Sequence, residues 1–449
     1  MTVGFPNKKT FCPAPWFQIR NRHDMTKTAC CRMYWTPHDP ETKNMEPLQA
    51  LNTNLYKEVK KNLHSGIKDK NCRSCWQDEK HGLQSLRQKY MFLLQEANPN
   101  YLKNYFANKK NYESDTILSA DIKIGNTCNY ACVMCFPSAS SLVYNKWTKD
   151  KSSEFVKEQL KLDPLYLDKV KKYSFANDQY LEYVMSVVSN NKDLFYLKLL
   201  GGEPLLSTRV LKYLHELPVE RKKKITLQFT TNASKDVVGV LKYLGEFKQF
   251  NIVISLEGVG PLQEYARWGS RWHEQEKFIL ELKAYAEQVK NINISLQHCF
   301  QTTTVLGFKN LVDWCVKNKI NMGFLTTLVE PDYLSLSTLP ENSKKEIIKV
   351  LEQSNFKVDR NVYQNEDDEQ TFTKEQLINL LKSTQFDFAL YKRFLRYIEW
   401  YEKDKKGILP LKKQYPELFI ETVDEKTTSK ITKNIKESTK KWQRFWQEH

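Results

Sequence analysis

The sequence predicts an α/β protein built around a parallel sheet, and three observations lead to that prediction. Short β-rich runs alternate with helix-length segments through the middle of the chain. The chain has 449 residues, which is enough for two or three domains. Its hydrophobic content of 41% is sufficient for at least one large core. Strands joined by helix-length connections run parallel, so we expect a barrel or an open doubly wound sheet.

Six segments in the middle of the chain have the composition and period of strands. They are Ile117–Gly125, Phe195–Gly202, Lys224–Asn232, Asn251–Gly258, Asn291–Phe300 and Asn321–Leu328. Residues 1–116 precede them and contain two expected helices, Leu48–Ser65 and Gly82–Glu96, joined by irregular connections. Residues 339–449 follow 117–338 with a helical, Lys/Glu-rich pattern and no expected strand. Near the C-terminus, Trp442, Phe445 and Trp446 form an apolar stripe that we interpret as docking onto the protein's own core rather than onto a membrane.

Charge and cysteine content limit the classes of function. The formal net charge is +16, but lysine outnumbers arginine by 56 to 13. Nucleic-acid readers usually rely on arginine forks, so we interpret the charge as a solvated surface and expect weak or no nucleic-acid binding. No apolar run could span a membrane, and the N-terminus lacks the apolar core of a secretory signal. We therefore expect a cytoplasmic protein without a membrane partner, whose ten cysteines bind metal rather than form disulfides.

Three cysteines, Cys128, Cys132 and Cys135, follow the first predicted strand in the segment CNYACVMC. The C-terminal edge of a parallel sheet is where α/β proteins place their active sites. A structural zinc would need a fourth ligand, and none is adjacent. An iron–sulfur cube has four irons to ligate, so three thiolates leave one iron open for a substrate or cofactor.

This CxxxCxxC segment, followed by LLGGEP at Leu199–Pro204, resembles the radical S-adenosylmethionine (SAM) superfamily. The resemblance implies a partial (β/α)6 TIM-type barrel, with a [4Fe-4S] cluster on the three cysteines and SAM on the open iron. Reduction of the cluster would cleave SAM to a 5′-deoxyadenosyl radical, which abstracts hydrogen from a substrate. An electron donor such as flavodoxin or ferredoxin is implied as a partner.

Further residues at the strand ends are candidates for binding SAM. In GGEP we expect the glycines to let the backbone approach the ligand, and Glu203 to accept a hydrogen bond from the methionyl ammonium; a structural turn is the alternative. Arg267 resembles a family arginine that pairs with the SAM carboxylate. The strand period places other candidates on the inner face of the barrel, with Cys299 beside them. The full set is Gly201, Gly202, Glu203, Pro204, Thr231, Asn232, Ser255, Glu257, Arg267, Ser295 and Gln297.

A second group of cysteines lies in the segments FCPAPW, TACC and NCRSCW. These segments resemble the N-terminal part of twitch-domain radical SAM proteins, in which a short auxiliary module holds one additional cluster. By position the ligands would be Cys12, Cys30, Cys72 and Cys75, with Cys31 as the alternative to Cys30. Four cysteines ending in CxxC equally suit a structural zinc, so zinc stays open beside a second [4Fe-4S] cluster, which the resemblance favours.

Taken together, these motifs predict a radical SAM enzyme acting on a small molecule or a peptide. Its substrate would be a peptide side chain, a sugar or aminocyclitol, or a nucleotide, and no residue is assigned to substrate chemistry. One alternative is an RNA-modifying protein. The other is a cluster-bearing scaffold that no longer cleaves SAM, against which the three cysteines, GGEP and Arg267 argue.

Overall fold

The computed structural model describes residues 9–33, 40–80, 85–97, 105, 112–161, 163–174, 177–353, 357–359 and 371–419. The apolar stripe expected near the C-terminus, which contains Trp442, lies outside these ranges. In the part of the chain that is described, no helix is both long and apolar enough to cross a membrane.

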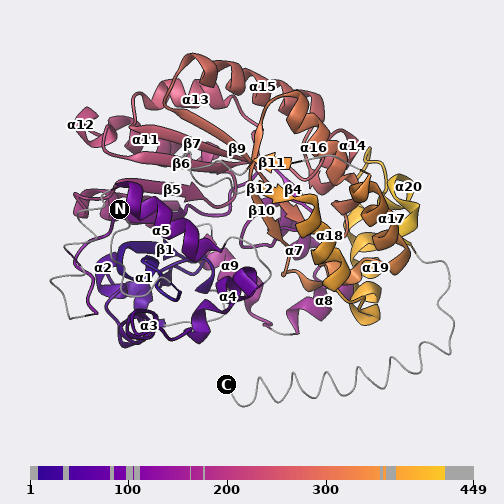
Figure 1. Ribbon diagram of the computed structural model, residues 1–449, viewed down its shortest axis with the longest axis horizontal. Helices are drawn as coiled ribbons and strands as arrows, with labels where there is room; N and C mark the ends of the chain where they lie inside the picture. The colour runs from indigo at the N-terminus through magenta and orange to yellow at the C-terminus, as the bar shows by residue number, and fades with distance from the viewer. Residues whose placement is uncertain are drawn as a thin grey trace.

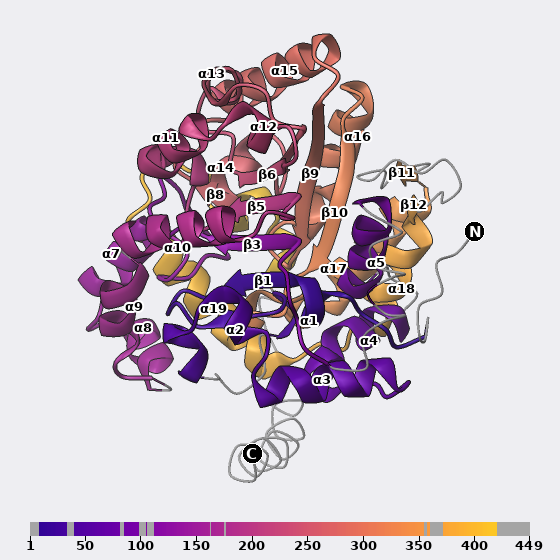
Figure 2. The ribbon, with the colours of Figure 1, turned by 90° about the vertical axis from the view of Figure 1, so that its left-hand side faces the viewer.

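The core of the molecule is one eight-stranded sheet in the order β10-β9-β7-β6-β5-β3-β1-β2. Neighbouring strands are parallel, except that β2 is antiparallel to β1. The strands are β1 Gln18–Asn21, β2 Lys27–Thr28, β3 Ser119–Lys123, β5 Tyr196–Leu200, β6 Thr226–Thr231, β7 Gln249–Ser255, β9 Ile292–Phe300 and β10 Asn321–Thr327. All six predicted strands are confirmed, as β3, β5, β6, β7, β9 and β10. Figure 2 shows β9 and β10 side by side at one end of the sheet, and the fold is a partial TIM-type barrel.

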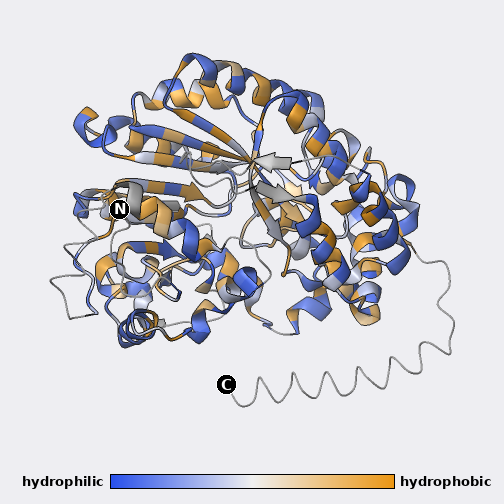
Figure 3. Cartoon of the chain, viewed as in Figure 1, coloured by the Kyte–Doolittle hydropathy of each residue, from blue (hydrophilic) through white to orange (hydrophobic). Residues whose placement is uncertain are grey.

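Alternating side chains determine which face of the sheet is covered by helices. In β3, Ala120 and Ile122 are fully buried on one face, and Asp121 and Lys123 project to the other. The apolar face packs against helices such as α10 and α15, which carry both hydrophobic and hydrophilic segments (Figure 3). The helices of this region are α7 Ser141–Lys149, α8 Glu154–Leu160, α9 Tyr166–Ser174, α10 Asn177–Asn190, α11 Thr208–Glu216, α12 Val219–Lys222, α13 Val237–Leu244, α14 Pro261–Ala266, α15 Trp272–Gln288 and α16 Phe308–Lys317. The other face is polar and forms the inside of the barrel.

The N-terminal region contributes helices and also the far edge of the sheet (Figure 1). Its helices are α1 Ala14–Phe17, α2 Pro47–Ala50, α3 Asn54–His64, α4 Arg73–Lys80 and α5 Leu86–Ala97. The helix expected at Leu48–Ser65 is therefore divided into α2 and α3, and the one expected at Gly82–Glu96 is α5. The sequence did not reveal β1, which pairs with β3 so that Arg20 faces Asp121. Its four residues, QIRN, contain one apolar side chain, too few for a strand period to be detected.

The C-terminal region is mainly helical, with α17 Glu341–Glu352, α18 Lys374–Ser383, α19 Phe388–Glu402 and α20 Leu411–Gln414. The expectation that it has no strand was wrong. β11 (Lys357–Asp359) and β12 (Thr371–Thr373) pair antiparallel. Strands of three residues are shorter than the window in which alternation can be recognised. Short 3₁₀ helices complete the described structure: η2 Pro40–Asn44, η3 Lys70–Cys72, η4 Pro204–Leu206, η5 Val305–Gly307, η6 Asp332–Leu334, η7 Leu336–Thr338 and η8 Pro416–Leu418.

Candidate functional site

The segment 125–135, which we call the cysteine loop, leaves the C-terminal end of β3 and carries Cys128, Cys132 and Cys135. Part of it forms β4 (Ala131–Cys132), which pairs antiparallel with β8 (Arg267–Trp268) and places Cys132 opposite Arg267. The N–H of Val133 continues this pairing by donating to the carbonyl of Ala266 at 2.8 Å. The cysteine loop is thus held on one side by the segment that carries Arg267.

The GGEP segment holds the cysteine loop from another side. The N–H of Gly202 donates to the Gly125 carbonyl at 3.0 Å, and the N–H of Glu203 donates to the Thr127 carbonyl at 2.8 Å. A Cβ on Gly202 would lie 2.1 Å from the Thr127 oxygen, and one on Gly201 would lie 2.6 Å from the Gly125 oxygen. We expected these glycines to admit a ligand. In the structure the backbone that approaches them is the cysteine loop itself, because only glycine leaves room for it.

Glu203 joins the ends of β5 and β6. Its Oε1 accepts from the N–H of Leu205 at 3.1 Å and from the Thr231 hydroxyl at 2.7 Å, and its Oε2 accepts from the N–H of Asn232 at 2.7 Å. Burial raises the pKa of Glu203, and the hydrogen bond from Asn232 opposes that shift. A carboxylate has about four acceptor sites, so these three bonds leave one acceptor site open. Pro204 follows at the start of η4.

Asn232 connects β6 to the cysteine loop. Its amide nitrogen donates to Asn129 Oδ1 at 3.0 Å and lies 4.0 Å from the sulfur of Cys128. Its carbonyl accepts from Gln275 on α15 at 2.6 Å. Sequence reasoning missed Asn129 and Gln275. A glutamine on a helix normally faces solvent, yet Gln275 is only 1% exposed.

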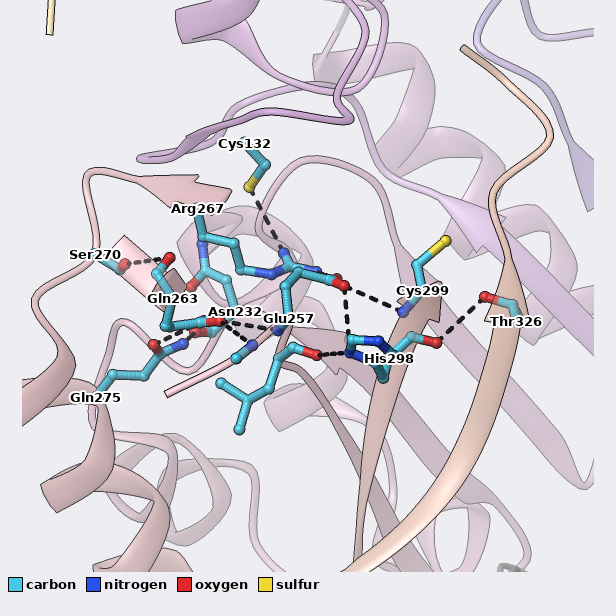
Figure 4. Close-up of polar contacts among 12 residues, drawn as sticks. Cys132, Asn232, Glu257, Gln263, Arg267, Ser270, Gln275, His298, Cys299 and Thr326 are labelled. Carbon is cyan, nitrogen blue, oxygen red and sulfur yellow. Dashed lines mark hydrogen bonds and ion pairs between the residues drawn. The ribbon is translucent and has the colours of Figure 1, made fainter. Parts of the chain in front are cut away.

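Arg267 and Glu257 form a buried ion pair beside Cys132 (Figure 4). The Arg267 Nη2 lies 2.7 Å from Glu257 Oε1, and Nη1 donates to the Cys132 sulfur at 3.6 Å. The Nε atom of Arg267 is buried without a partner among the described residues. Burial lowers the pKa of Arg267, but Cys132 and Glu257 outweigh it and the net shift is upward. Glu257 also accepts from the N–H of Cys299 at 3.1 Å.

His298 is a further neighbour of Glu257 that we had given no role. Its Nδ1 lies 3.6 Å from Glu257 Oε2 and 3.2 Å from the Leu256 carbonyl. Burial lowers the pKa of His298. The strand period places His298 on the outer face of β9, opposite Gln297 and Cys299. It therefore supports Glu257 from behind rather than from inside the barrel.

The remaining strand-end candidates lie on the inner face. Ser255 is aligned with Gln297, and Val253 is aligned with Ser295 one step earlier in the register of β7 and β9. Ser255 and Ser295 are 9% and 5% exposed. These side chains are placed together by the sheet, on the face that leads to the cysteine loop.

The three thiols of the cysteine loop differ in acidity. A hydrogen bond from Cys135 lowers the pKa of Cys132 to about 7 against the effect of burial, and Arg267 assists. Burial and the neighbouring Cys132 raise the pKa of Cys128 to about 12. Three sulfurs, one of them close to a thiolate at neutral pH and beside a guanidinium, form a donor set that suits three-cysteine iron–sulfur ligation.

A family comparison supports this assignment. Residues 122–315 match the model of the radical SAM superfamily. This segment is a radical SAM domain. It contains the cysteine loop, GGEP and the Arg267–Glu257 pair, so the resemblance found in the sequence is confirmed at the level of the superfamily. No curated protein matches the chain at the significance required.

Solved structures also match the chain, at low similarity. "Structure of TYW1 with a lysine-pyruvate adduct bound" is 12% identical over 55% of this chain and 75% of that chain, with a TM-score of 0.28. A tagged form of anSMEcpe with bound AdoMet is 18% identical over 51% and 55%, with a TM-score of 0.35. Streptococcus suis SuiB bound to S-adenosylmethionine is 17% identical over 71% and 53%, with a TM-score of 0.31. The chain thus spans about half the length of the latter two proteins, and such distant likeness does not extend to substrate or reaction.

Outside the radical SAM domain, the N-terminal cysteines come from three segments. Cys12 precedes α1, Cys30 follows β2, and Cys72 and Cys75 lie in η3 and α4. Burial raises the pKa of Cys12 to about 12 and that of Cys75 to about 11, and nearby thiols add to the shift of Cys12. Burial followed by Cys31 raises the pKa of Cys30, which Cys75 and Cys12 also affect. The five thiols are therefore neighbours, and both Cys30 and Cys31 stay open as ligands.

None of the described groups of His, Cys, Asp and Glu side chains converges closely enough to hold a single metal ion with three ligands. Ligands of a cube bind different irons, so their sulfurs stand farther apart than ligands of one zinc. This spacing applies both to the cysteine loop and to the N-terminal cysteines.

The C-terminal region closes over the cysteine loop of the radical SAM domain. The Tyr401 hydroxyl lies 3.2 Å from the Ala131 carbonyl and 2.9 Å from the Tyr265 carbonyl, and the Tyr397 hydroxyl donates to the Val133 carbonyl. Lys405 donates to the Ala131 carbonyl at 3.3 Å. We call Tyr397, Tyr401 and Lys405 the α19 clamp. Sequence reasoning missed it because more than 260 residues separate it from the loop.

Proposed function

We propose that this protein is a radical SAM enzyme that reductively cleaves SAM. The observation that supports this most strongly is the buried group of Cys132, Arg267 and Glu257 beside the cysteine loop, inside the region that matches the superfamily. Cys128, Cys132 and Cys135 would hold a [4Fe-4S] cluster. When bound, such a cluster supplies the electron that cleaves SAM to a 5′-deoxyadenosyl radical for hydrogen abstraction.

The chain's own residues would bind and orient SAM. The unpartnered Nε of Arg267 is suited to donate to the SAM carboxylate, and the open acceptor site on Glu203 is suited to the methionyl ammonium. Glu257 holds the guanidinium of Arg267 in place by its 2.7 Å contact. Gly201, Gly202, Pro204, Thr231 and Asn232 fix the strand ends around the ligand, and Ser255, Ser295 and Gln297 line the inner face. Positioning of this kind lowers a barrier by placing the reacting atoms in advance.

We further propose that residues 1–116 form an auxiliary, twitch-like module with a second [4Fe-4S] cluster on Cys12, Cys30, Cys72 and Cys75. The mutual effects of these thiols on their pKa values support a shared site. Residues 117–338 would be the radical SAM barrel and 339–449 a helical region that supports the loop. A cytoplasmic flavodoxin or ferredoxin would deliver the electron.

SAM cleavage tests the proposal directly. Anaerobically reconstituted protein, reduced with dithionite in the presence of SAM, should produce 5′-deoxyadenosine and methionine, measured by liquid chromatography and mass spectrometry. Arg267→Lys keeps the charge but loses the planar fork. A lost charge-assisted hydrogen bond costs about 1.5–3 kcal/mol, so cleavage at limiting SAM should fall by about tenfold to a hundredfold.

Arg271→Lys is the matched control, because the Arg271 side chain is 72% exposed. It should cleave SAM as the wild type does. Wild-type cleavage in Arg267→Lys would remove Arg267 from the SAM site. A cluster-loaded wild type that forms no 5′-deoxyadenosine would contradict the proposed function and favour a scaffold.

A further inference from the structure

A row of polar side chains crosses the inner face of the barrel below the cysteine loop. Its members face one another in the parallel register, one from each of six neighbouring strands, β1, β3, β5, β6, β7 and β9. They are Arg20, Asp121, Lys198, Gln228, Asn251 and Asn293. A parallel barrel normally fills its inside with branched apolar side chains. A continuous polar row here therefore needs an explanation that packing does not supply.

The charges in this row do not balance. Asp121 is the one carboxylate in the row, with Oδ2 2.9 Å from the Arg20 guanidinium and 3.8 Å from the Lys198 ammonium. Asp121 is 3% exposed, whereas the side chains of Arg20 and Lys198 are 19% and 28% exposed. Lys123 lies two residues after Asp121 on the same face of β3. Three cations thus surround a single carboxylate on a partly open surface.

Lys123 is the cation that lacks a counterion. In the described part of the chain, no hydrogen bond or ion pair involves its ammonium. Burial, followed by repulsion from Arg20, lowers the pKa of Lys123 to about 8. Cys135 and Asp24 act in the opposite direction, which places Lys123 between Arg20 and the cysteine loop.

Several polar atoms on the same face are also unsatisfied. Asp121 Oδ1, Thr230 Oγ1 and Asn251 Oδ1 are buried without a hydrogen-bond partner among the described residues. Thr230 is aligned with Val253, one step nearer the cysteine loop than Asn251. Buried polar atoms are rarely left unpaired in folded proteins, because each one costs free energy. Their position beside excess cations indicates a place for a polar, charged ligand.

We propose that Arg20, Lys123 and Lys198 bind an oxyanion of the substrate, a carboxylate or a phosphate group, and so set the substrate class of the enzyme. This inference rests on the proposed function. The guanidinium of Arg20 can bind such a group through two parallel bonds, with the two ammonium groups as additional charges. Asp121 holds Arg20 and Lys198 in place and limits the affinity. Substrates without an anionic group, including a cationic aminocyclitol, would be repelled.

Pyridoxal 5′-phosphate is a suitable probe, because it carries both a phosphate and an aldehyde. A lysine amine adds to the aldehyde and releases water, and borohydride then reduces the C=N bond to a stable amine. In cluster-loaded protein with saturating SAM, we expect Lys123 to be labelled at least tenfold faster than exposed lysines, as found by peptide mapping. Inorganic phosphate and glutarate should both protect it. Pyridoxal without the phosphate should label at least tenfold more slowly.

Two variants should act in opposite directions. Arg20→Gln should slow the labelling of Lys123, because a cation is lost. Asp121→Asn should accelerate it, because the competing carboxylate is removed; a damaged fold would not produce a gain. Arg209→Gln is the matched control, since its side chain is 60% exposed and paired with an exposed aspartate, and it should label as the wild type does.

Three results would overturn the proposal. Labelling that is indifferent to phosphate and to both variants would show that no oxyanion site exists. Protection by SAM alone would assign the cations to the SAM site, and protection by cluster reconstitution alone would assign them to neutralising the clusters. Formation of 5′-deoxyadenosine, measured in the same preparation, separates this test from that of the proposed function.

Discussion

The cysteine loop and the N-terminal cysteines assemble their thiols in different ways. Cys128, Cys132 and Cys135 lie within eight residues, and backbone hydrogen bonds from GGEP and β8, with the α19 clamp, fix the loop that carries them. The N-terminal thiols come from separate segments, 12 to 75 in the chain, and meet only because those segments pack into one core. The first site is therefore organised by its own backbone, and the second depends on the tertiary fold of its region.

The two groups also differ in electrostatics. Cys132 lies beside Arg267, and the pKa of its thiol is lowered to about 7. Burial raises the pKa of Cys12 to about 12 and that of Cys75 to about 11. Metal binding requires thiolates, so the N-terminal group must release more protons when it binds a metal. Metal should accordingly contribute more to the folding of the N-terminal region than to that of the radical SAM domain.

Gly202→Ala should separate the two groups most strongly. The new methyl group would lie 2.1 Å from the Thr127 carbonyl oxygen and 2.5 Å from its carbon, so the cysteine loop must move. We expect reconstituted protein to lose the iron of the loop and at least a hundredfold of SAM cleavage, and to keep the N-terminal metal. Iron analysis and the 5′-deoxyadenosine assay measure both effects.

Gly239→Ala on α13 is the control for that variant. Its Cβ would meet the Asp236 carboxylate, the end of a flexible side chain that can move away. The cost should stay near 1 kcal/mol, the value of a helix cap, with iron content unchanged. Normal loop iron in Gly202→Ala would show that the contact between GGEP and the cysteine loop does not organise the site.

Lys405→Met should change how stability depends on pH on the loop side of the comparison. Burial lowers the pKa of Lys405 to about 6, from an ordinary value of 10.5. Between these values the unfolded state binds more protons than the folded state, so the contribution of Lys405 to the free energy of unfolding rises with pH. The wild type should therefore gain stability relative to Lys405→Met as the pH increases from 6 to 9.

Urea unfolding at three pH values provides that measurement. Lys406→Met serves as the control, because Lys406 is exposed and should follow the pH dependence of the wild type. Parallel stability curves for Lys405→Met and the wild type would mean that Lys405 stays charged in the folded protein.

Two tyrosines allow a smaller, matched comparison. Tyr401 bonds to the Ala131 carbonyl beside Cys132, and the Tyr56 hydroxyl accepts from the N–H of Ala29 beside Cys30 at 3.2 Å. Each Tyr→Phe change should cost about 0.5–1.5 kcal/mol for each hydrogen bond lost. Tyr401→Phe should accelerate iron release to a chelator from the loop alone, and Tyr56→Phe from the N-terminal group alone. Equal effects on both groups would refute independent support.

The parts of this protein that sequence could predict are those with local patterns. The six central strands, the cysteine loop and GGEP follow from period, spacing and glycine content within short windows. The α19 clamp, Gln275 and β1 could not be found in that way. Their contacts join segments far apart in the chain, and their residues have ordinary compositions for surface helices or short strands. His298 had a usable signal, since alternation along β9 places it behind Gln297 and Cys299.

Iron content and SAM cleavage, measured together in two sets of cysteine variants, test most directly whether the two groups have separate roles. The wild type should hold about eight irons, four for each cluster. Replacing Cys128, Cys132 and Cys135 by alanine should leave about four irons and abolish 5′-deoxyadenosine formation. Replacing Cys72 and Cys75 should also leave about four irons, but with SAM cleavage retained. Continued cleavage without the three loop cysteines, or a wild type with about four irons and one zinc, would contradict this account.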